Sequence, residues 1–268
     1  MAGCTHNCST CSSKCSSAIE YFSLHERAKV KNIIGIVSGK GGVGKSLFTT
    51  LIASKMAKLG YNVGILDADI TGPSIPKSFG VTEMAMGSQL GIYPNETKEG
   101  IKMMSVNLLV DDPNKPVVFR GPALGSIIKQ FYSDVMWGDL DYLFIDMPPG
   151  TSDVTLTVFQ QIPVDGLIVV STPQDLVKMM VKKSITMAEM LNVKIIGLVE
   201  NMSYVKCPNC DERFEIFGKS HIHETAAEHG LEVLASLPID PLIREYVDNG
   251  KIYQYDCEGL EKLVEAIK

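Results

Sequence analysis

A glycine-rich stretch at residues 39–46, with the sequence GKGGVGKS, has the clearest chemical potential in the chain. It satisfies the P-loop pattern G-x-x-x-x-G-K-S/T, in which closely folded backbone N–H groups surround a phosphate chain. In this pattern the lysine reaches the β- and γ-phosphates and the hydroxyl group binds Mg²⁺, which assigns these roles to Lys45 and Ser46. The predicted nucleotide-contacting residues are Gly39, Lys40, Gly41, Gly42, Val43, Gly44, Lys45 and Ser46.

The same glycines also fit two other interpretations. Gly39, Gly41 and Gly44 match the dinucleotide-binding pattern G-x-G-x-x-G, with Asp67 at the place of a ribose-binding acid. A plain turn between a strand and a helix would also favour glycine. Only a nucleoside triphosphate with Mg²⁺ gives a use to the lysine and serine that follow, so the P-loop interpretation is favoured.

Three carboxylates follow apolar strands and fit the same chemistry. Asp67 and Asp69 come at the end of the strand expected at 63–66, and Asp146 ends the strand expected at 142–145. Asp146 holds the position of a Walker-B acid, which binds a magnesium-bound water. Gly150, in the loop PPGT that follows, could offer its N–H group to a γ-phosphate.

A cysteine pair, Cys207 and Cys210, forms a C-x-x-C motif after a predicted strand. Two thiolates are incomplete as a metal site, because tetrahedral zinc and a 4Fe–4S cluster each need about four protein ligands. The missing ligands would come from a second copy of the chain across a two-fold axis, or from the N-terminal cysteines. A shared iron–sulfur cluster is the favoured interpretation, while zinc, redox chemistry and purely structural thiols remain open.

Four further cysteines stand close together near the N-terminus: Cys4, Cys8, Cys11 and Cys15. They suffice for a complete cluster in one subunit, although their spacing departs from the ferredoxin run. A zinc site that includes His6, or thiols of a flexible tail without a ligand, are the alternatives. The seventh cysteine, Cys257, is expected in the core or on a helix face.

The elements that must position these residues alternate between strands and helices. Strands are expected at 33–37, 63–66, 142–145, 166–170, 194–199 and 231–234, and helices at 46–59, 176–191, 222–228 and 257–267. This alternation predicts an α/β fold, a mostly parallel, doubly wound P-loop NTPase sheet with helices on both faces. Residues 90–109 are expected to form a hairpin-like excursion with a turn at 94–96. We expect residues 1–30 to form a short, flexible, Cys-rich cluster-binding segment, and 31–268 to form the ATPase domain with the C-x-x-C motif.

Composition and charge exclude several classes of protein. The chain has 268 residues, 45% of them hydrophobic, with 25 Lys and Arg against 31 Asp and Glu for a net charge of −6. Such an acidic chain is a poor nucleic-acid coat, and no apolar run approaches the roughly 18 residues of a spanning helix. With no apparent secretory leader, we expect a cytoplasmic protein with reduced cysteines, and neither nucleic acid nor membrane as a partner.

Longer motifs resemble one family. The stretch GKGGVGKS, with its additional Lys40, resembles the deviant Walker A of the MinD/ParA/nitrogenase-iron-protein class of dimeric ATPases. The segments ILDADITGPSIPKSFG, FRGP, DMPPGTSD and VENMSY followed by CPNC resemble the narrower Mrp/ApbC family of ATP-binding iron–sulfur cluster carriers. The resemblance implies a homodimeric ATPase that assembles a cluster, of 4Fe–4S type and bridging the dimer, and transfers it to apo-proteins.

The resemblance also implies roles for single residues. Lys40 would reach the partner's nucleotide across the dimer interface, and Asp69 would orient the attacking water with support from Asp67. Asn201 falls at the position of an adenine contact, and the loop that starts at Pro238 would close over the base. Arg120, in FRGP, receives no role.

Three other functions compete with a cluster carrier. A spatial regulator of the MinD/ParA kind needs a basic amphipathic tail or a basic DNA-binding face, which an acidic chain does not favour. An electron-donating reductase like nitrogenase iron protein would use single, widely separated cysteines, whereas this chain has an adjacent pair. A small-metabolite kinase would leave both cysteine groups unexplained.

Overall fold

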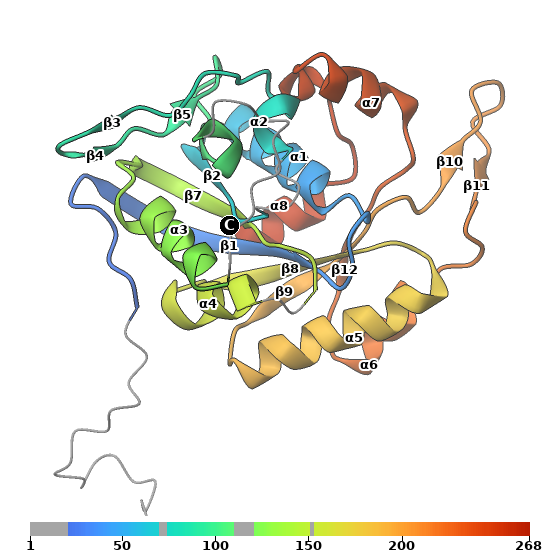
Figure 1. The fold of residues 1–268 in the computed structure, drawn as a ribbon. Coiled ribbons are helices and arrows are strands. Elements are labelled where there is room, and N and C mark those ends of the chain that lie inside the picture. Colours follow the sequence, from blue (N-terminus) through green and yellow to red (C-terminus); the bar gives the residue numbers. More distant parts are fainter. Residues whose placement is uncertain (1–20, 70–73, 110–120, 151–152) are drawn as a thin grey trace, which may run out of the picture.

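A large twisted sheet lies at the centre of the molecule (Figure 1). The computed structural model describes residues 21–69, 74–109, 121–150 and 153–268. Within these ranges the sheet has eight strands in the order β12-β9-β8-β1-β7-β2-β6-β5. Every neighbouring pair is parallel except β5 and β6, which are antiparallel. The strands are β1 (Ala28–Ser38), β2 (Val63–Asp67), β5 (Asn95–Glu96), β6 (Lys102–Met104), β7 (Gly138–Asp146), β8 (Gly166–Ser171), β9 (Ile195–Glu200) and β12 (Val233–Ser236).

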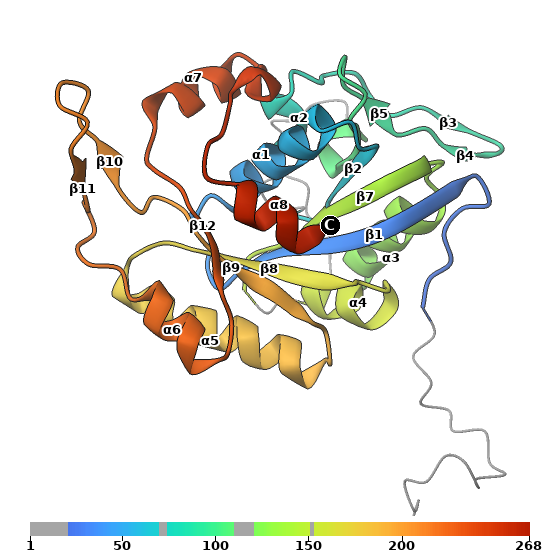
Figure 2. The same cartoon turned by 180° about the vertical axis from the view of Figure 1, so that it is seen from behind.

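Helices cover both faces of this sheet, as Figures 1 and 2 show from opposite sides. One face packs against α3 (Gly121–Ser133), α4 (Asp153–Gln161), α5 (Asp175–Met190) and α6 (Ile222–Glu228). The other packs against α1 (Lys45–Lys58), α2 (Ile75–Ser78), α7 (Pro241–Asp248) and α8 (Glu261–Ile267). Two short 3₁₀ helices are η1 (Val106–Leu108) and η2 (Ile252–Gln254).

Each central strand contributes side chains to both cores. In β1, Ile33 and Val37 belong to the core under α3 and α4, while Ile34 and Ile36 belong to the core under α1. Successive residues of a strand point to opposite faces, so a strand that is covered on both faces is apolar throughout. The predicted doubly wound, mostly parallel sheet is therefore confirmed.

The sheet brings the predicted functional residues to one edge. The strand β1 leads directly into the glycine-rich loop, and α1 begins at Lys45. In the register between β2 and β7, Asp67 lies opposite Asp146. The carboxyl ends of β1, β2 and β7 thus meet beside the P-loop, as parallel strands require.

The excursion at 90–109 differs in detail from the expectation. It begins earlier, because β3 (Gly87–Ser88) precedes residue 90 and pairs with β4 (Gly91–Ile92), and β5 then pairs with β6. The predicted turn at 94–96 is wrong, because Asn95 and Glu96 form β5. The chain turns instead at residues 97–100, where Gly100 has φ +86° and donates its N–H to the Thr97 carbonyl at 3.0 Å.

The cysteine pair lies on a hairpin of β10 (Val205–Lys206) and β11 (Arg213–Phe214). This hairpin is inserted between β9 and α6 and projects beyond the sheet (Figure 1). At the other end of the chain, β1 begins at Ala28, within the segment expected to be separate up to residue 30. Among the helices of the described residues, none is both long and apolar enough to cross a membrane.

Candidate functional site: a P-loop and a cysteine hairpin

The glycine-rich loop has the backbone of a phosphate cradle. Gly42 and Gly44 have φ values of +78° and +81°, which side chains other than glycine rarely adopt. Gly44 is also crowded, since a Cβ there would lie 2.1 Å from Nδ2 of Asn201. That Nδ2 donates to the Val43 carbonyl at 3.0 Å, so the residue that follows β9 supports the loop from far along the sequence. The loop ends at the N-terminus of α1, whose partial positive charge attracts phosphate.

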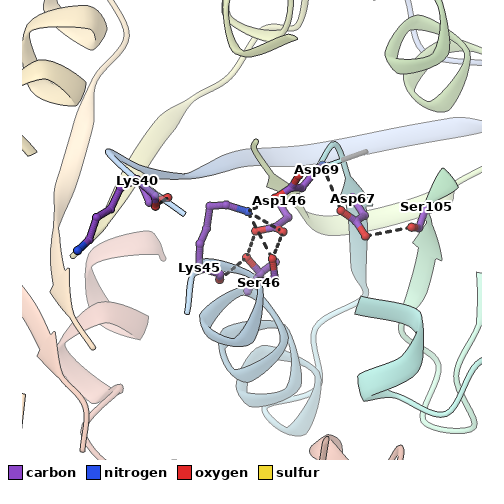
Figure 3. A network of polar contacts seen from close by, with 9 residues as sticks. Lys40, Lys45, Ser46, Asp67, Asp69, Ser105 and Asp146 are labelled. Carbon is purple, nitrogen blue, oxygen red and sulfur yellow. Dashed lines mark hydrogen bonds and ion pairs between the residues drawn. The ribbon is translucent and has the colours of Figure 1, made fainter. Parts of the chain in front are cut away.

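A buried network joins the P-loop to the carboxylate at the end of β7 (Figure 3). Nζ of Lys45 lies 2.8 Å from Oδ2 of Asp146, and the two side chains are 5% and 0% exposed. Ser46 Oγ donates to the same oxygen at 2.6 Å, and Thr49 Oγ1 donates to Oδ1 at 2.8 Å. All four polar groups are thereby held at fixed positions next to the phosphate cradle.

The charges of this site fit a divalent cation. Lys45 also lies 3.8 Å from Asp69, and Asp67 is buried nearby. The formal charge of Lys45 with Asp67, Asp69 and Asp146 is 1 − 3 = −2. Oxygen ligands such as the Ser46 hydroxyl and a carboxylate are those that Mg²⁺ takes beside nucleotide phosphates. The residues therefore fit the predicted magnesium, with Ser46 and Asp146 as the groups that would hold it.

Asp67 and Asp69 occupy different environments. Asp67 is 1% exposed, and its carboxylate accepts hydrogen bonds from Ser105 Oγ at 3.0 Å and from the Asp69 backbone N–H at 3.2 Å. Burial raises the pKa of Asp67 well above its ordinary value, and the negative charge of Asp146 raises it further. Asp67 thus fixes the segment that carries Asp69, whose side chain lies nearer to Lys45.

Two residues that are predicted to contact phosphate, Lys40 and Gly150, make hydrogen bonds within the chain instead. Lys40 points away from the Lys45 network (Figure 3). Its Nζ donates to Oε1 of Gln174. The N–H of Gly150, a residue with φ +75°, donates to the Ser38 carbonyl at 2.8 Å. A contact between Gly150 and a γ-phosphate would therefore exchange this bond for a new one.

The predicted base-contacting residues lie on neighbouring segments. Asn201 is 4% exposed and follows β9 directly. Pro238 follows Leu237, whose N–H donates to the Glu200 carbonyl at 2.8 Å. The structure thus brings these two segments together, while the roles of Asn201 and Pro238 towards adenine stay predictions.

The cysteine pair sits on the turn of the projecting hairpin. The Cys207 N–H donates to the Glu212 carbonyl at 2.9 Å, and the Asp211 N–H donates to the Cys207 carbonyl at 3.0 Å. Cys210 is exposed and Cys207 half-buried. Backbone N–H groups of Asn209 and Cys210 lower the pKa of the Cys207 thiol, which favours the thiolate that binds metals. In the part of the chain that the structure describes, no group of three or more Cys, His, Asp or Glu side chains could hold a metal ion.

Some predicted residues lie outside the described residues: Cys4, Cys8, Cys11, Cys15, His6 and Arg120. Conversely, the structure adds Thr49, Ser105 and Gln174, which the sequence did not single out. Thr49 had a detectable signal, since it stands one helical turn after Lys45. Ser105 and Gln174 come from distant segments and have no local pattern.

Comparison with known proteins supplies the family. The family described as "ParA: NUBPL iron-transfer P-loop NTPase" matches residues 29–267. This chain belongs to that family. The resemblance to the Mrp/ApbC carriers is thereby confirmed, and the NUBPL-family chain is a P-loop NTPase.

Relatives cover nearly the whole chain. The iron–sulfur cluster carrier protein of Clostridium perfringens is 44% identical over 94% of this chain and 95% of its own length. The protein of the same name from Methanocaldococcus jannaschii is 45% identical over 100% of this chain and 96% of its own. The "Cytosolic Fe-S cluster assembly factor CFD1" of Kluyveromyces lactis is 41% identical over 87% of this chain and 86% of its own.

Solved structures agree with this assignment. A nucleotide-binding protein of Archaeoglobus fulgidus, in complex with ADP, has 42% identity and a TM-score of 0.77 over 87% of this chain and 91% of its own. The septum site-determining protein MinD of Pyrococcus horikoshii, in complex with Mg-ADP, has 20% identity and a TM-score of 0.59 over 89% of this chain and 95% of its own. The second likeness shows the fold alone.

Proposed function

We propose that this NUBPL-family chain is an ATP-hydrolysing iron–sulfur cluster carrier that assembles a cluster and transfers it to apo-proteins. The observation that carries the proposal is a cysteine pair, with Cys210 exposed and Cys207 half-buried, on a projecting hairpin of a chain that also has a P-loop. The names of its relatives, which are cluster carriers and a cytosolic assembly factor, support the same function and a cytoplasmic location.

The cysteine pair supports a homodimer. Cys207 and Cys210 supply two of the about four thiolates that a 4Fe–4S cluster needs. A two-fold axis would place an identical pair opposite, which completes the set. An exposed hairpin turn suits a cluster that must be released to an acceptor. The four N-terminal cysteines are proposed as a second, complete site within each subunit, outside the described residues.

The hydrolytic step follows from the P-loop network. The backbone of residues 39–46 and the Lys45 ammonium would bind the β- and γ-phosphates, and Mg²⁺ would neutralise charge that develops on them. Asp69 would orient the attacking water, with Asp67 holding its segment in place. Lys40, which points away from the network of its own subunit, would meet the nucleotide of the partner copy.

Anaerobic reconstitution with iron and sulfide tests the carrier function. We expect charge-transfer absorbance and about four iron atoms per dimer in a variant that lacks the four N-terminal cysteines. Replacing Cys207 and Cys210 by alanine in this background should abolish both signals. Cys257→Ala is the matched control, since this buried thiol lies in the core and should leave iron content unchanged. Iron that survives loss of the hairpin cysteines, or zinc that is bound in its place, would contradict the proposal.

The nucleotide function has its own test. The variant Lys45→Ala should lose Mg·ATP binding and hydrolysis, because it removes the ammonium next to the phosphate cradle. Lys58→Ala, on the last turn of the same helix, is the control. Unchanged turnover in Lys45→Ala would disprove the P-loop role.

A further inference from the structure

A buried carboxylate lies at the base of the cysteine hairpin. Glu200, the last residue of β9, is 3% exposed. Ser203 Oγ donates to its Oε2 at 2.8 Å, and Ser220 Oγ donates to its Oε1. Ser203 precedes β10 and Ser220 follows β11, so one side chain is bonded to both segments that connect the hairpin to the fold.

The hairpin depends on such contacts for its orientation. Its strands pair with each other through Val205 with Phe214 and Lys206 with Arg213. These bonds hold the strands together but do not join them to the central sheet, since β10 and β11 form a sheet of their own. A two-stranded hairpin alone is only marginally stable in water, so its position must be fixed at its base.

The two sides of the base are held differently. On the entry side, the Ser203 N–H donates to the Leu237 carbonyl at 2.9 Å and the Ile239 N–H donates to the Tyr204 carbonyl at 2.8 Å. On the exit side, Ser220 Oγ both donates to Glu200 and accepts the Ile222 N–H at 3.1 Å. The bond to Glu200 therefore ties the start of α6, and with it the exit side, to the end of β9.

The same strand end also contacts the nucleotide loop. Asn201, the next residue, donates to the Val43 carbonyl and lies against Gly44. Neighbouring residues of one segment are thus bonded to the P-loop and to the cysteine hairpin.

We propose that Glu200 is a positioning residue for the cluster-binding cysteines, which fixes both sides of their hairpin to the end of β9 beside the P-loop. The inference deepens the proposed function and rests on it where it concerns the cluster. The buried carboxylate needs donors, because an unpaired charge in this position would be costly. The hydroxyls of Ser203 and Ser220, on the two sides of the hairpin base, are these donors.

Hydrogen exchange tests the positioning directly. The variant Ser203→Ala/Ser220→Ala removes only two hydroxyl groups and leaves the backbone intact. We expect the amides of Cys207 and Asp211 to exchange about tenfold faster, which corresponds to ~1.4 kcal/mol. Glu200→Gln should exchange at the wild-type rate within about twofold, because its amide can still pair with both hydroxyls. Glu215→Gln, exposed just after β11, removes a charge without touching the base and should also match wild type.

Cluster release gives a second measurement. The double serine variant should lose iron to a chelator about tenfold faster than wild type, with its ADP affinity unchanged within about twofold, since the bond from Asn201 to Val43 remains. Wild-type exchange and release in this variant would overturn the proposal. Equal acceleration of exchange in β1 and β7 would also overturn it, because Glu200 would then support only the fold.

The two proposals fail separately. If the cysteine-free hairpin keeps its iron, the proposed cluster site is wrong, whereas the exchange result for the hairpin base still stands. If the cluster depends on Cys207 and Cys210 but the serine variant behaves as wild type, only the role of Glu200 is wrong.

Discussion

Replacing Gly44 by alanine should destabilise the fold for two reasons: the positive φ of this residue and the contact of the new Cβ with Asn201. The residue has φ +81°, and a left-handed backbone costs a non-glycine residue about 1–2 kcal/mol. The new Cβ would lie 2.1 Å from Nδ2 of Asn201, a side chain that is 4% exposed and bonded to Val43. Moving that side chain sacrifices a hydrogen bond worth about 1 kcal/mol. We therefore expect the free energy of unfolding to fall by about 2–3 kcal/mol, and the melting temperature by roughly 4–12 °C.

Two control variants isolate the contact with Asn201. Gly42 has φ +78° and no atom within 4 Å of an added Cβ, so Gly42→Ala carries the backbone cost alone. In an Asn201→Ala background, Gly44→Ala should cost no more than Gly42→Ala. Thermal or urea denaturation without nucleotide is the assay, because phosphate contacts then do not enter the comparison. The reasoning is refuted if Gly44→Ala costs no more than Gly42→Ala, or if its cost is the same with and without the Asn201 side chain.

Three more predictions concern buried polar groups. The pKa of Asp67 is raised in the folded state, so its contribution to stability is present at a pH below the ordinary pKa of an aspartate and is lost as the pH rises. Asp67→Asn should therefore melt at a higher temperature than wild type at pH 7, and the difference should shrink towards pH 3. A lower melting temperature of the variant at pH 7 would contradict this. Thr49→Val removes a donor to Asp146 and should weaken Mg·ADP binding about fivefold by calorimetry, a loss of ~1 kcal/mol, while unchanged affinity would exclude a role in holding that carboxylate. Burial raises the pKa of the Cys257 thiol to about 12, so its contribution to stability should be lost as the pH rises from about 9 to about 12. At pH 8 mass spectrometry should find Cys257 unmodified by iodoacetamide while the exposed Cys210 reacts, and equal rates would show that Cys257 is not protected.

The central sheet was predictable because its strands are short apolar runs with clear stops. The run that ends at Ser38 becomes β1, and the runs before Asp67 and Asp146 become β2 and β7. Parallel strands covered on both faces need such runs, and their carboxyl ends must share an edge. The convergence of the acids on the P-loop followed from this topology.

Several helices were missed because their local propensity is weak. The helix α3 carries Gly121, Pro122 and Gly125, and α4 carries β-branched Thr155 and Thr157, all unfavourable in helices. Packing against the sheet overrides these preferences, since Ile128, Phe131 and Tyr132 of α3 share one core. The start of α7 did have a signal: Asp240 accepts the Leu242 N–H as an N-cap, and Pro241 follows it.

The polar contacts around the site were harder to predict than the P-loop itself. The P-loop is a continuous motif, whereas Ser105 reaches Asp67 from the residue between β6 and η1, and Ser220 reaches Glu200 across the whole cysteine hairpin. A serine gives no sign in the sequence of which distant carboxylate it will meet. Only the folded topology brings these partners together.

The two edge strands of the central sheet are too short to favour strand addition between copies of this protein. One edge strand is β5, two residues long, and the other is β12, four residues long, where Lys262 Nζ also bonds to the Val233 carbonyl. Such short edge strands offer an incoming strand few unpaired N–H and C=O groups, which disfavours the growth of fibres by strand addition. The pairing of one copy with another through the ends of the sheet is therefore unfavourable, and the sheet stays a closed scaffold behind the P-loop.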